Sequence, residues 1–338
     1  MPTWRDLING DPLTWLLEED EANPAVRYLA LRDLSGLPRD SPELVTARSA
    51  MYSSGTIRHI LDAQNPEDYW VKPGGGYNPK YTGSVWSLTL LAQLGADKSE
   101  PRVKAAAGYV LSNTISPMGW LSYNGTPSGF IHCHSGYLGE AMINLGFGDD
   151  PRLTTAIEMQ ARLVTGEGIA DFGSENPVRF YHYTPGPGFV CGKLPCAWGA
   201  VKALKAIASL PERRRTQTMN DAIERGKELF FSADLTICKF SNREKGKPSG
   251  NWFKFGFPSF YISDVLEVLE VLSRLGEGQH PHLEPVWKLV LEKQDATGRW
   301  PMEYSYNGKL WSDIEVKGEP SKWVTLRVLR ALKAAFPG

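Results

Sequence analysis

The chain has 338 residues, of which 42% are hydrophobic and 22% charged, and its formal net charge is -1. This composition is typical of a globular protein with a large buried core and argues against disorder. A net charge near zero gives no reason to expect nucleic acid or an anionic membrane as a partner, because both select strongly basic surfaces. No segment approaches the ~20 apolar residues of a membrane span, so we expect a cytoplasmic protein, and the near-neutral charge favours a small, neutral or modestly charged ligand.

Most segments of the chain carry apolar residues at helical spacing, while strand patterns are weak and scattered. The pattern begins at 25–34 (AVRYLALRDL), returns at 84–95 (SVWSLTLLAQLG) and is clear again at 262–276 (ISDVLEVLEVLSRLG). Helix ends are marked by Gly or Pro. The sequence therefore predicts an all-α fold.

The predicted helix ends repeat at regular intervals. The last apolar residue before each Gly or Pro stop is Leu94, Leu145, Leu210 or Leu275. Each interval fits one apolar helix, a turn and a second, amphipathic helix, and such pairs must stack to bury their faces. We expect an α/α toroid of five to six helical hairpins over residues 51–338, preceded by an N-terminal helical extension over residues 1–50.

A short motif follows the last of the amphipathic helices. Gln294, Gly298 and Trp300 stand in the arrangement Q-x3-G-x-W, and Gln64 and Trp70 form a partial copy. This resembles the QW motif of the squalene-hopene cyclase and prenyltransferase superfamily, whose members are α/α toroids. We expect the glutamine to cap backbone groups at the end of its own helix and the tryptophan to pack over the neighbouring repeat.

The resemblance does not extend to the acidic D-x-D-D motif of the proton-initiated cyclases, which this sequence lacks. Other toroids of this kind, the protein prenyltransferase β subunits and the lanthipeptide cyclases, hold zinc in the central cavity. The C-H-G-x-x-G sequence of lanthipeptide cyclases is similar to the stretch from Cys133 to Gly139, with one residue inserted, and CAWG at 196–199 resembles their second cysteine context. The order of the two along the chain is reversed.

Two predicted inner-helix starts carry the candidate metal ligands. Cys133 and His134 open one helix, and Cys191 and Cys196 precede the next. In a toroid these starts converge, so a zinc site with three thiolates and one imidazole is one interpretation, and helix N-termini would lower the pKa values of the thiols. The alternative is that these are buried, inert thiols that pack as small hydrophobes. A redox or disulfide role is a third.

Catalytic and cavity-lining candidates come from other loops and helix starts. His182 lies in a long aromatic loop and could act as an acid or base, and Asp264 stands at a predicted inner-helix start, where a helix-terminal charge is the simpler explanation. Aromatic residues recur on the inner helices and could wall a substrate cavity, although such residues also fill ordinary cores. They are Tyr81, Trp86, Tyr137, Trp198, Tyr261 and Trp323.

These features favour a prenyltransferase- or terpene cyclase-like enzyme that acts on a small apolar or isoprenoid-like substrate, with zinc as a candidate cofactor. A non-catalytic binding or scaffold toroid with structural cysteines is the alternative from another class. A carbohydrate-active α/α barrel is a third, but it needs a pair of carboxylates that the predicted inner helices do not show. The oligomeric state is not predicted.

Overall fold

The computed structural model describes the chain except for residues 1, 168–186, 192–193 and 238–249. It divides into two compact units. The first unit comprises Met1–Ala63, Phe253–Ser259 and Asp264–Gly338, and the second comprises Gln64–Trp252 and Phe260–Ser263. The N-terminal segment therefore packs with the C-terminal helices, and the boundary at residue 50 stays a prediction.

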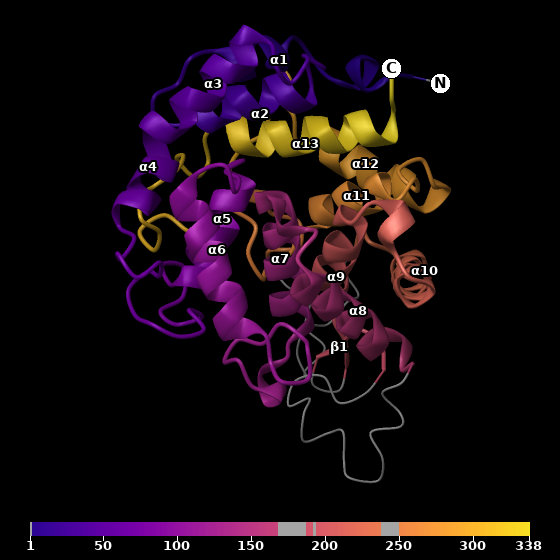
Figure 1. The fold of residues 1–338 in the computed structure, drawn as a ribbon. Coiled ribbons are helices and arrows are strands. Elements are labelled where there is room, and N and C mark those ends of the chain that lie inside the picture. The colour runs from indigo at the N-terminus through magenta and orange to yellow at the C-terminus, as the bar shows by residue number, and fades with distance from the viewer. Residues whose placement is uncertain (1, 168–186, 192–193, 238–249) are drawn as a thin grey trace. The chain divides into compact units, whose positions relative to one another are not determined.

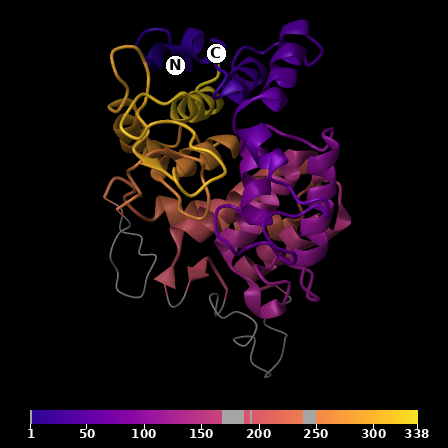
Figure 2. The ribbon, with the colours of Figure 1, turned by 90° about the vertical axis from the view of Figure 1, so that its left-hand side faces the viewer.

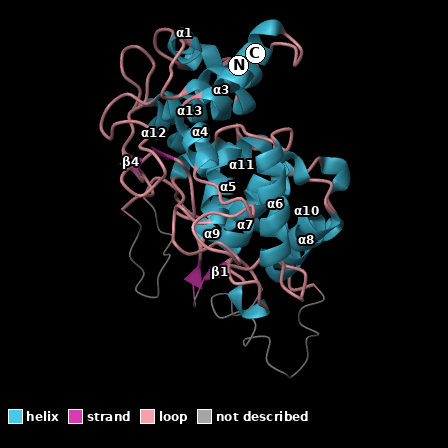
Figure 3. Ribbon diagram, turned by 60° about the vertical axis from the view of Figure 1, so that its left-hand side comes forward, coloured by secondary structure: helices cyan, strands magenta, loops and turns pink. Residues whose placement is uncertain are grey.

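Helices dominate both units, as Figure 3 shows, and the prediction of an all-α fold is confirmed. In the described ranges the strands are two residues long. They are β1 (Val190–Cys191), which pairs antiparallel with β2 (Leu194–Pro195), and β3 (Gly256–Phe257), which pairs parallel with β4 (Tyr304–Ser305). Within the same ranges, none of the helices combines the length and apolarity that a bilayer crossing requires.

The described part of the second unit contains three helical hairpins arranged in two layers (Figure 1). Helices α5, α7 and α9 contact one another in that order, and α6, α8 and α10 pack on their outer side. The hairpins are α5 (Ser84–Gln93) with α6 (Pro101–Thr114), α7 (His132–Met142) with α8 (Pro151–Thr165), and α9 (Ala197–Ser209) with α10 (Gln217–Phe231). This double layer matches the predicted pairing of apolar inner and amphipathic outer helices.

The inner helices are buried because their sequences are apolar on every side. Every residue from Ser84 to Ala92 in α5 is buried. Two of the predicted helix ends are observed in this unit, since Leu94 and Leu210 are the C-terminal caps of α5 and α9, whereas Leu145 lies inside a π-helical turn, Ile143–Phe147, that follows α7. The outer helices α6 and α8 begin with a proline in the first turn and an acidic cap, and in α6 the Glu100 side chain accepts from the backbone N–H of Arg102.

Helices α7 and α9 approach each other until their backbones touch. A Cβ atom added to Gly136 would lie 2.3 Å from the carbonyl carbon of Lys202. An ion pair between Lys205 and Glu140, at 3.4 Å, joins the same two helices. Because Gly136 has no side chain, the first turn of α7 is held directly against α9.

The first unit combines the two ends of the chain. Helix α13 contacts α1, α2 and α11, and in Figure 2 the yellow α13 lies beside the indigo N-terminal helices. The backbone N–H of Trp4 donates to the carbonyl oxygen of Phe336 at 2.9 Å. The helices are α1 (Pro12–Leu17), α2 (Pro24–Asp33), α3 (Pro42–Ser53), α4 (Gly55–Asp62), α11 (Val265–Arg274), α12 (Glu284–Leu291) and α13 (Lys322–Ala335).

The motif that resembles the QW pattern lies in this unit, but its two side chains have roles other than those expected. The Gln294 amide accepts from the backbone N–H of Asn9 at 2.7 Å and donates to the carbonyl of Leu7 at 3.2 Å. It is the Trp300 indole that bonds the last turn of the preceding helix, by donating to the carbonyl of Val290 at 2.7 Å. The glutamine therefore fastens the N-terminal segment instead of capping its own helix.

Candidate functional site

Aromatic side chains from five parts of the second unit meet in one group, which we call the aromatic cluster. Trp86 comes from α5, two members come from α7, one from the start of α9, and the others from the segments before α5 and α11. The members are Tyr77, Tyr81, Trp86, His134, Tyr137, Trp198, Phe260 and Tyr261.

Trp86 stands at the centre of the aromatic cluster and is fully buried. Its ring stacks on Tyr137 with centroids 5.4 Å apart and meets Phe260 edge-on at 5.2 Å. The indole N–H donates to the carbonyl of Tyr77 at 2.7 Å. The polar atom of the indole is thus satisfied, so the ring contributes apolar, electron-rich surface to the cluster.

Tyr81 and Tyr261 are half-buried members of the aromatic cluster. The hydroxyls of Tyr81 and Tyr261 lie 3.4 Å apart, and Trp198 meets Tyr261 with ring centroids 6.3 Å apart. The exposed Lys80 places its ammonium group 4.8 Å from the centroid of the Tyr261 ring. Tyr81 has a φ of 73°, which is unusual for a tyrosine and turns its ring toward Trp86, with ring centroids 5.3 Å apart.

The structure brings together five of the six aromatic residues predicted from the sequence. The sixth, Trp323, lies in the first unit, where its ring stacks on Phe257 at 4.1 Å and its indole donates to the Asn23 side chain at 2.8 Å. Tyr77 and Phe260 are members that sequence reasoning missed. Tyr77 follows three consecutive glycines, and its proximity to Tyr81, four residues on, was the available signal.

Two buried polar groups inside the aromatic cluster lack hydrogen-bond partners among the described residues. They are the His134 imidazole, at both ring nitrogens, and the Tyr137 hydroxyl. The two rings lie 5.3 Å apart, and His134 is 1% exposed. Burial lowers the pKa of His134 to about 3 and raises the pKa of Tyr137. Because an unpaired buried polar group costs about 1–3 kcal/mol, this pair indicates a site prepared for a polar group of a ligand.

The three described cysteines lie beside one another at one end of this layer. Cys133 is in the first turn of α7, Cys191 is in β1, and Cys196 is the N-terminal cap of α9. A hydrogen bond from Cys196 lowers the pKa of Cys191 to about 7. Burial raises the pKa of Cys133 to about 12, and the bond to Cys191 raises that of Cys196. The expected lowering of thiol pKa values by helix N-termini is therefore outweighed at Cys133 and Cys196.

The predicted zinc ligands were Cys133, His134, Cys191 and Cys196. Across the described part of the chain, no three or more His, Cys, Asp or Glu side chains are grouped so that they could hold a metal ion. The imidazole of His134 lies instead between Tyr77 and Tyr137. The zinc site stays a prediction from the sequence.

Of the two predicted catalytic residues, His182 lies outside the described residues. Asp264 is in the first unit, where it caps α11 by accepting from the N–H of Glu267 at 2.9 Å. Its carboxylate also accepts hydrogen bonds from both terminal nitrogens of Arg327, at 3.0 and 3.1 Å. Burial raises the pKa of Asp264, and Arg327 opposes that effect. These contacts describe a helix cap with a buried ion pair, and a catalytic role for Asp264 stays a prediction.

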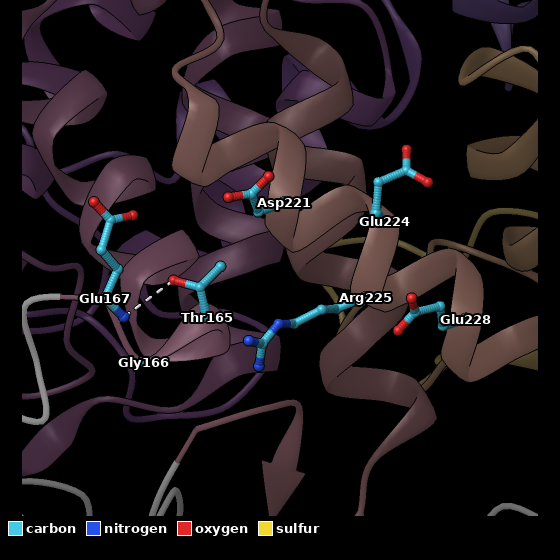
Figure 4. A pocket seen from close by; sticks show the side chains of 7 residues that line it. All are labelled: Thr165, Gly166, Glu167, Asp221, Glu224, Arg225 and Glu228. Carbon is cyan, nitrogen blue, oxygen red and sulfur yellow. Dashed lines mark hydrogen bonds between the residues drawn. The ribbon is translucent and has the colours of Figure 1, made fainter.

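A polar hollow of about 810 Å³ lies elsewhere in the second unit, between the end of α8 and α10 (Figure 4). Four carboxylates and one arginine line it, and parts of this lining are already paired. The Arg225 guanidinium donates to the carbonyl of Val164 at 3.2 Å, and the Thr218 hydroxyl donates to Glu167 at 2.6 Å. The hollow does not share a residue with the aromatic cluster.

No protein-family model matches this sequence, and no curated protein does. Solved structures that it resembles include variants of the type II terpene cyclase MstE from Scytonema. One, in complex with geranylgeranyl dihydroxybenzoate, is 16% identical and aligns over 82% of this chain and 95% of its own, with a TM-score of 0.36. Another, in complex with merosterolic acid A, is 16% identical over 83% and 95%, with a TM-score of 0.32. We transfer no residue role from similarities of this size.

Proposed function

We propose that this protein is a terpene cyclase- or prenyltransferase-like enzyme, and that the aromatic cluster binds a small, largely apolar, isoprenoid-like substrate. The observation that carries the proposal is the unpartnered pair of His134 and Tyr137, buried among aromatic rings in the second unit. Apolar walls with a few convergent polar groups are the usual composition of a small-molecule site.

The aromatic rings suit a substrate that passes through a carbocation. Ring faces attract positive charge, and the attraction is strongest where water is excluded. Trp86 is fully buried, and Tyr137 is stacked against it. A hydrocarbon chain that lay against these rings would therefore find both apolar contact and stabilisation of developing positive charge.

His134 has the properties of a proton acceptor in such a reaction. Its imidazole is neutral at physiological pH because burial lowers its pKa to about 3. A carbocation would lose a proton from the neighbouring carbon to a free ring nitrogen, and the electron pair of that C–H bond would form a carbon–carbon double bond. The Tyr137 hydroxyl, buried beside it, would bind a polar group of the substrate or product.

The test uses geranylgeraniol and geranylgeranyl diphosphate as probes, with binding followed by calorimetry and products by gas chromatography and mass spectrometry. In the His134→Gln variant kcat should fall by about 100-fold, the typical loss of a general base, while KM stays within threefold. In Tyr137→Phe, KM should rise instead. The matched control is His59→Gln, which changes an exposed histidine on α4.

Failure of both probes to bind the wild-type protein would contradict the proposed substrate class. Binding without any product would support the non-catalytic binding protein instead. A loss of activity in His59→Gln equal to that in His134→Gln would remove His134 from the mechanism.

A further inference from the structure

Cys191 and Cys196 lie on one face of the hairpin formed by β1 and β2. The strands pair Val190 with Pro195 and Cys191 with Leu194. Continuing that register pairs Phe189 with Cys196, and the N–H of Cys196 does donate to the carbonyl of Phe189 at 2.7 Å. Because side chains alternate along a strand, Cys191 and Cys196 are diagonal neighbours on the same face.

The two thiols are already in contact. The Cys196 thiol donates a hydrogen bond to the sulfur of Cys191. At its other side the Cys196 sulfur accepts from the N–H of Gly199, at 3.4 Å, in the first turn of α9. Both cysteines carry free thiols in this structure.

The two thiols differ in access to solvent. Cys196 is 6% exposed, whereas Cys191 is partly exposed on its strand. An oxidant in solution therefore reaches Cys191 first, and Cys196 is placed behind it as the second thiol. This is the usual arrangement of an attacking and a resolving cysteine.

We propose that Cys191 and Cys196 form a reversible intrachain disulfide, with a hydroperoxide as the oxidant. The sulfur of Cys191 attacks the peroxide and the O–O bond breaks. Cys191 becomes a sulfenic acid, and an alcohol or water leaves. The Cys196 sulfur then attacks the sulfenic sulfur and water departs. Two thiols lose two electrons, the peroxide gains them, and a dithiol restores the reduced pair. The proposal is independent of the isoprenoid substrate.

The disulfide would alter the start of α9. A disulfide holds its sulfur atoms about 2.05 Å apart, which draws the Cys196 sulfur from the Gly199 N–H toward β1. Trp198, a member of the aromatic cluster, lies two residues after Cys196. The oxidation state of the pair is therefore coupled to the position of one wall of the cluster.

The test treats the full-length protein with one equivalent of hydrogen peroxide, blocks free thiols and digests it with trypsin without reduction. Cleavage after Lys193 separates the cysteines into peptides 180–193 and 194–202. We expect most molecules to yield these two peptides joined, with the loss of two hydrogen atoms, and dithiothreitol to separate them. In Cys196→Ser the joined pair should vanish, and dimedone should label Cys191 as a sulfenic acid.

The matched control is Cys133→Ser, which removes the third thiol beside the pair and should leave the yield of joined peptides within twofold of the wild type. The proposal fails if wild-type Cys191 remains a free thiol after treatment. It also fails if Cys191 is joined to Cys133 or Cys238, or if it proceeds only to the sulfinic acid. Because the wild-type result is decisive, the outcome does not depend on the folding of a variant.

Discussion

The first turn of α7 carries two histidines whose surroundings differ although they are two residues apart. His132 bonds the carbonyl of Gly188 through one ring nitrogen at 3.1 Å, whereas His134 has no such partner among the described residues. Burial lowers the pKa of His132 to about 4 and that of His134 to about 3. Both imidazoles are therefore neutral in the folded protein. Their protonation in the unfolded chain makes the free energy of unfolding depend on pH.

The sign of that dependence follows from the lowered pKa values. Below pH 6.5 the unfolded chain takes up protons that the folded histidines refuse, so the free energy of unfolding falls as the pH falls. Between pH 7 and pH 5 each histidine should contribute a loss of about 2 kcal/mol, measurable by urea unfolding. In His134→Gln the decrease in the free energy of unfolding should be smaller by the contribution of one histidine, about 2 kcal/mol. His59→Gln, at an exposed site, should keep the full decrease, and an equal slope in both variants would refute the assignment.

The sequence was sufficient to single out His134, but the interpretation as a metal ligand rested on its neighbour Cys133. Which groups surround a side chain is decided by packing between elements far apart in the chain. Tyr77 reaches His134 from the loop before α5, and no local spacing indicates that contact. The aromatic residues were better predicted because a repeated helix start places equivalent positions on the same side of a layer.

Among the elements, the α7–α9 contact is the one most sensitive to a single methyl group. Two glycines lie one turn apart on α7. A Cβ at Gly136 would meet the backbone of Lys202 at 2.3 Å, while a Cβ at Gly139 would meet the Ala206 methyl at 3.4 Å, an ordinary contact. The two positions therefore form a matched pair within one helix.

Gly136→Ala should lower the free energy of unfolding by about 2–4 kcal/mol, because the backbone of α9 cannot move aside cheaply. Gly139→Ala should change it little or raise it by up to about 1 kcal/mol, since alanine favours the helix. Denaturant unfolding of both variants measures the difference. Equal effects of the two substitutions would mean that α7 and α9 are not in backbone contact.

Helix boundaries were the most predictable part of the elements, since Gly and Pro stops mark them locally. Leu94, Leu210 and Leu275 are C-terminal caps, as the repeat predicts, whereas Leu145 lies inside the π-helical turn after α7. The exchange of roles between Gln294 and Trp300 was not predictable. It depends on the N-terminal residues near Asn9, which lie 285 residues away in sequence.

At the scale of the whole molecule, the two ends of the chain belong to one unit while the aromatic cluster belongs to the other. Trp15 from α1 lies 4.3 Å from the guanidinium of Arg299, and Asp20 pairs with Lys322 at the start of α13 at 3.3 Å. The N-terminal segment therefore stabilises the last helix of the chain, although the repeat pattern predicts it to be a separate extension.

Deletion of residues 1–22 should loosen the first unit and leave the second unit nearly unchanged. We expect amide hydrogen exchange in α13 to accelerate at least tenfold, because local opening becomes easier when packed neighbours are removed. Amides of α7 and α9 serve as the internal control and should change by less than twofold. Equal acceleration in both units would show that they unfold as one.

The backbone contact at Gly136 limits which residues of the aromatic cluster could change the preference for the proposed substrate. Where the backbones of two helices touch, ordinary substitutions cannot change the distance between the helices. The contact between α7 and α9 therefore fixes the positions of His134 and Trp198. Tyr81 and Tyr261 instead stand on segments outside these helices, with their hydroxyls 3.4 Å apart. Variation in the size of the bound molecule should therefore arise at these two tyrosines, and libraries for altered specificity are best concentrated there.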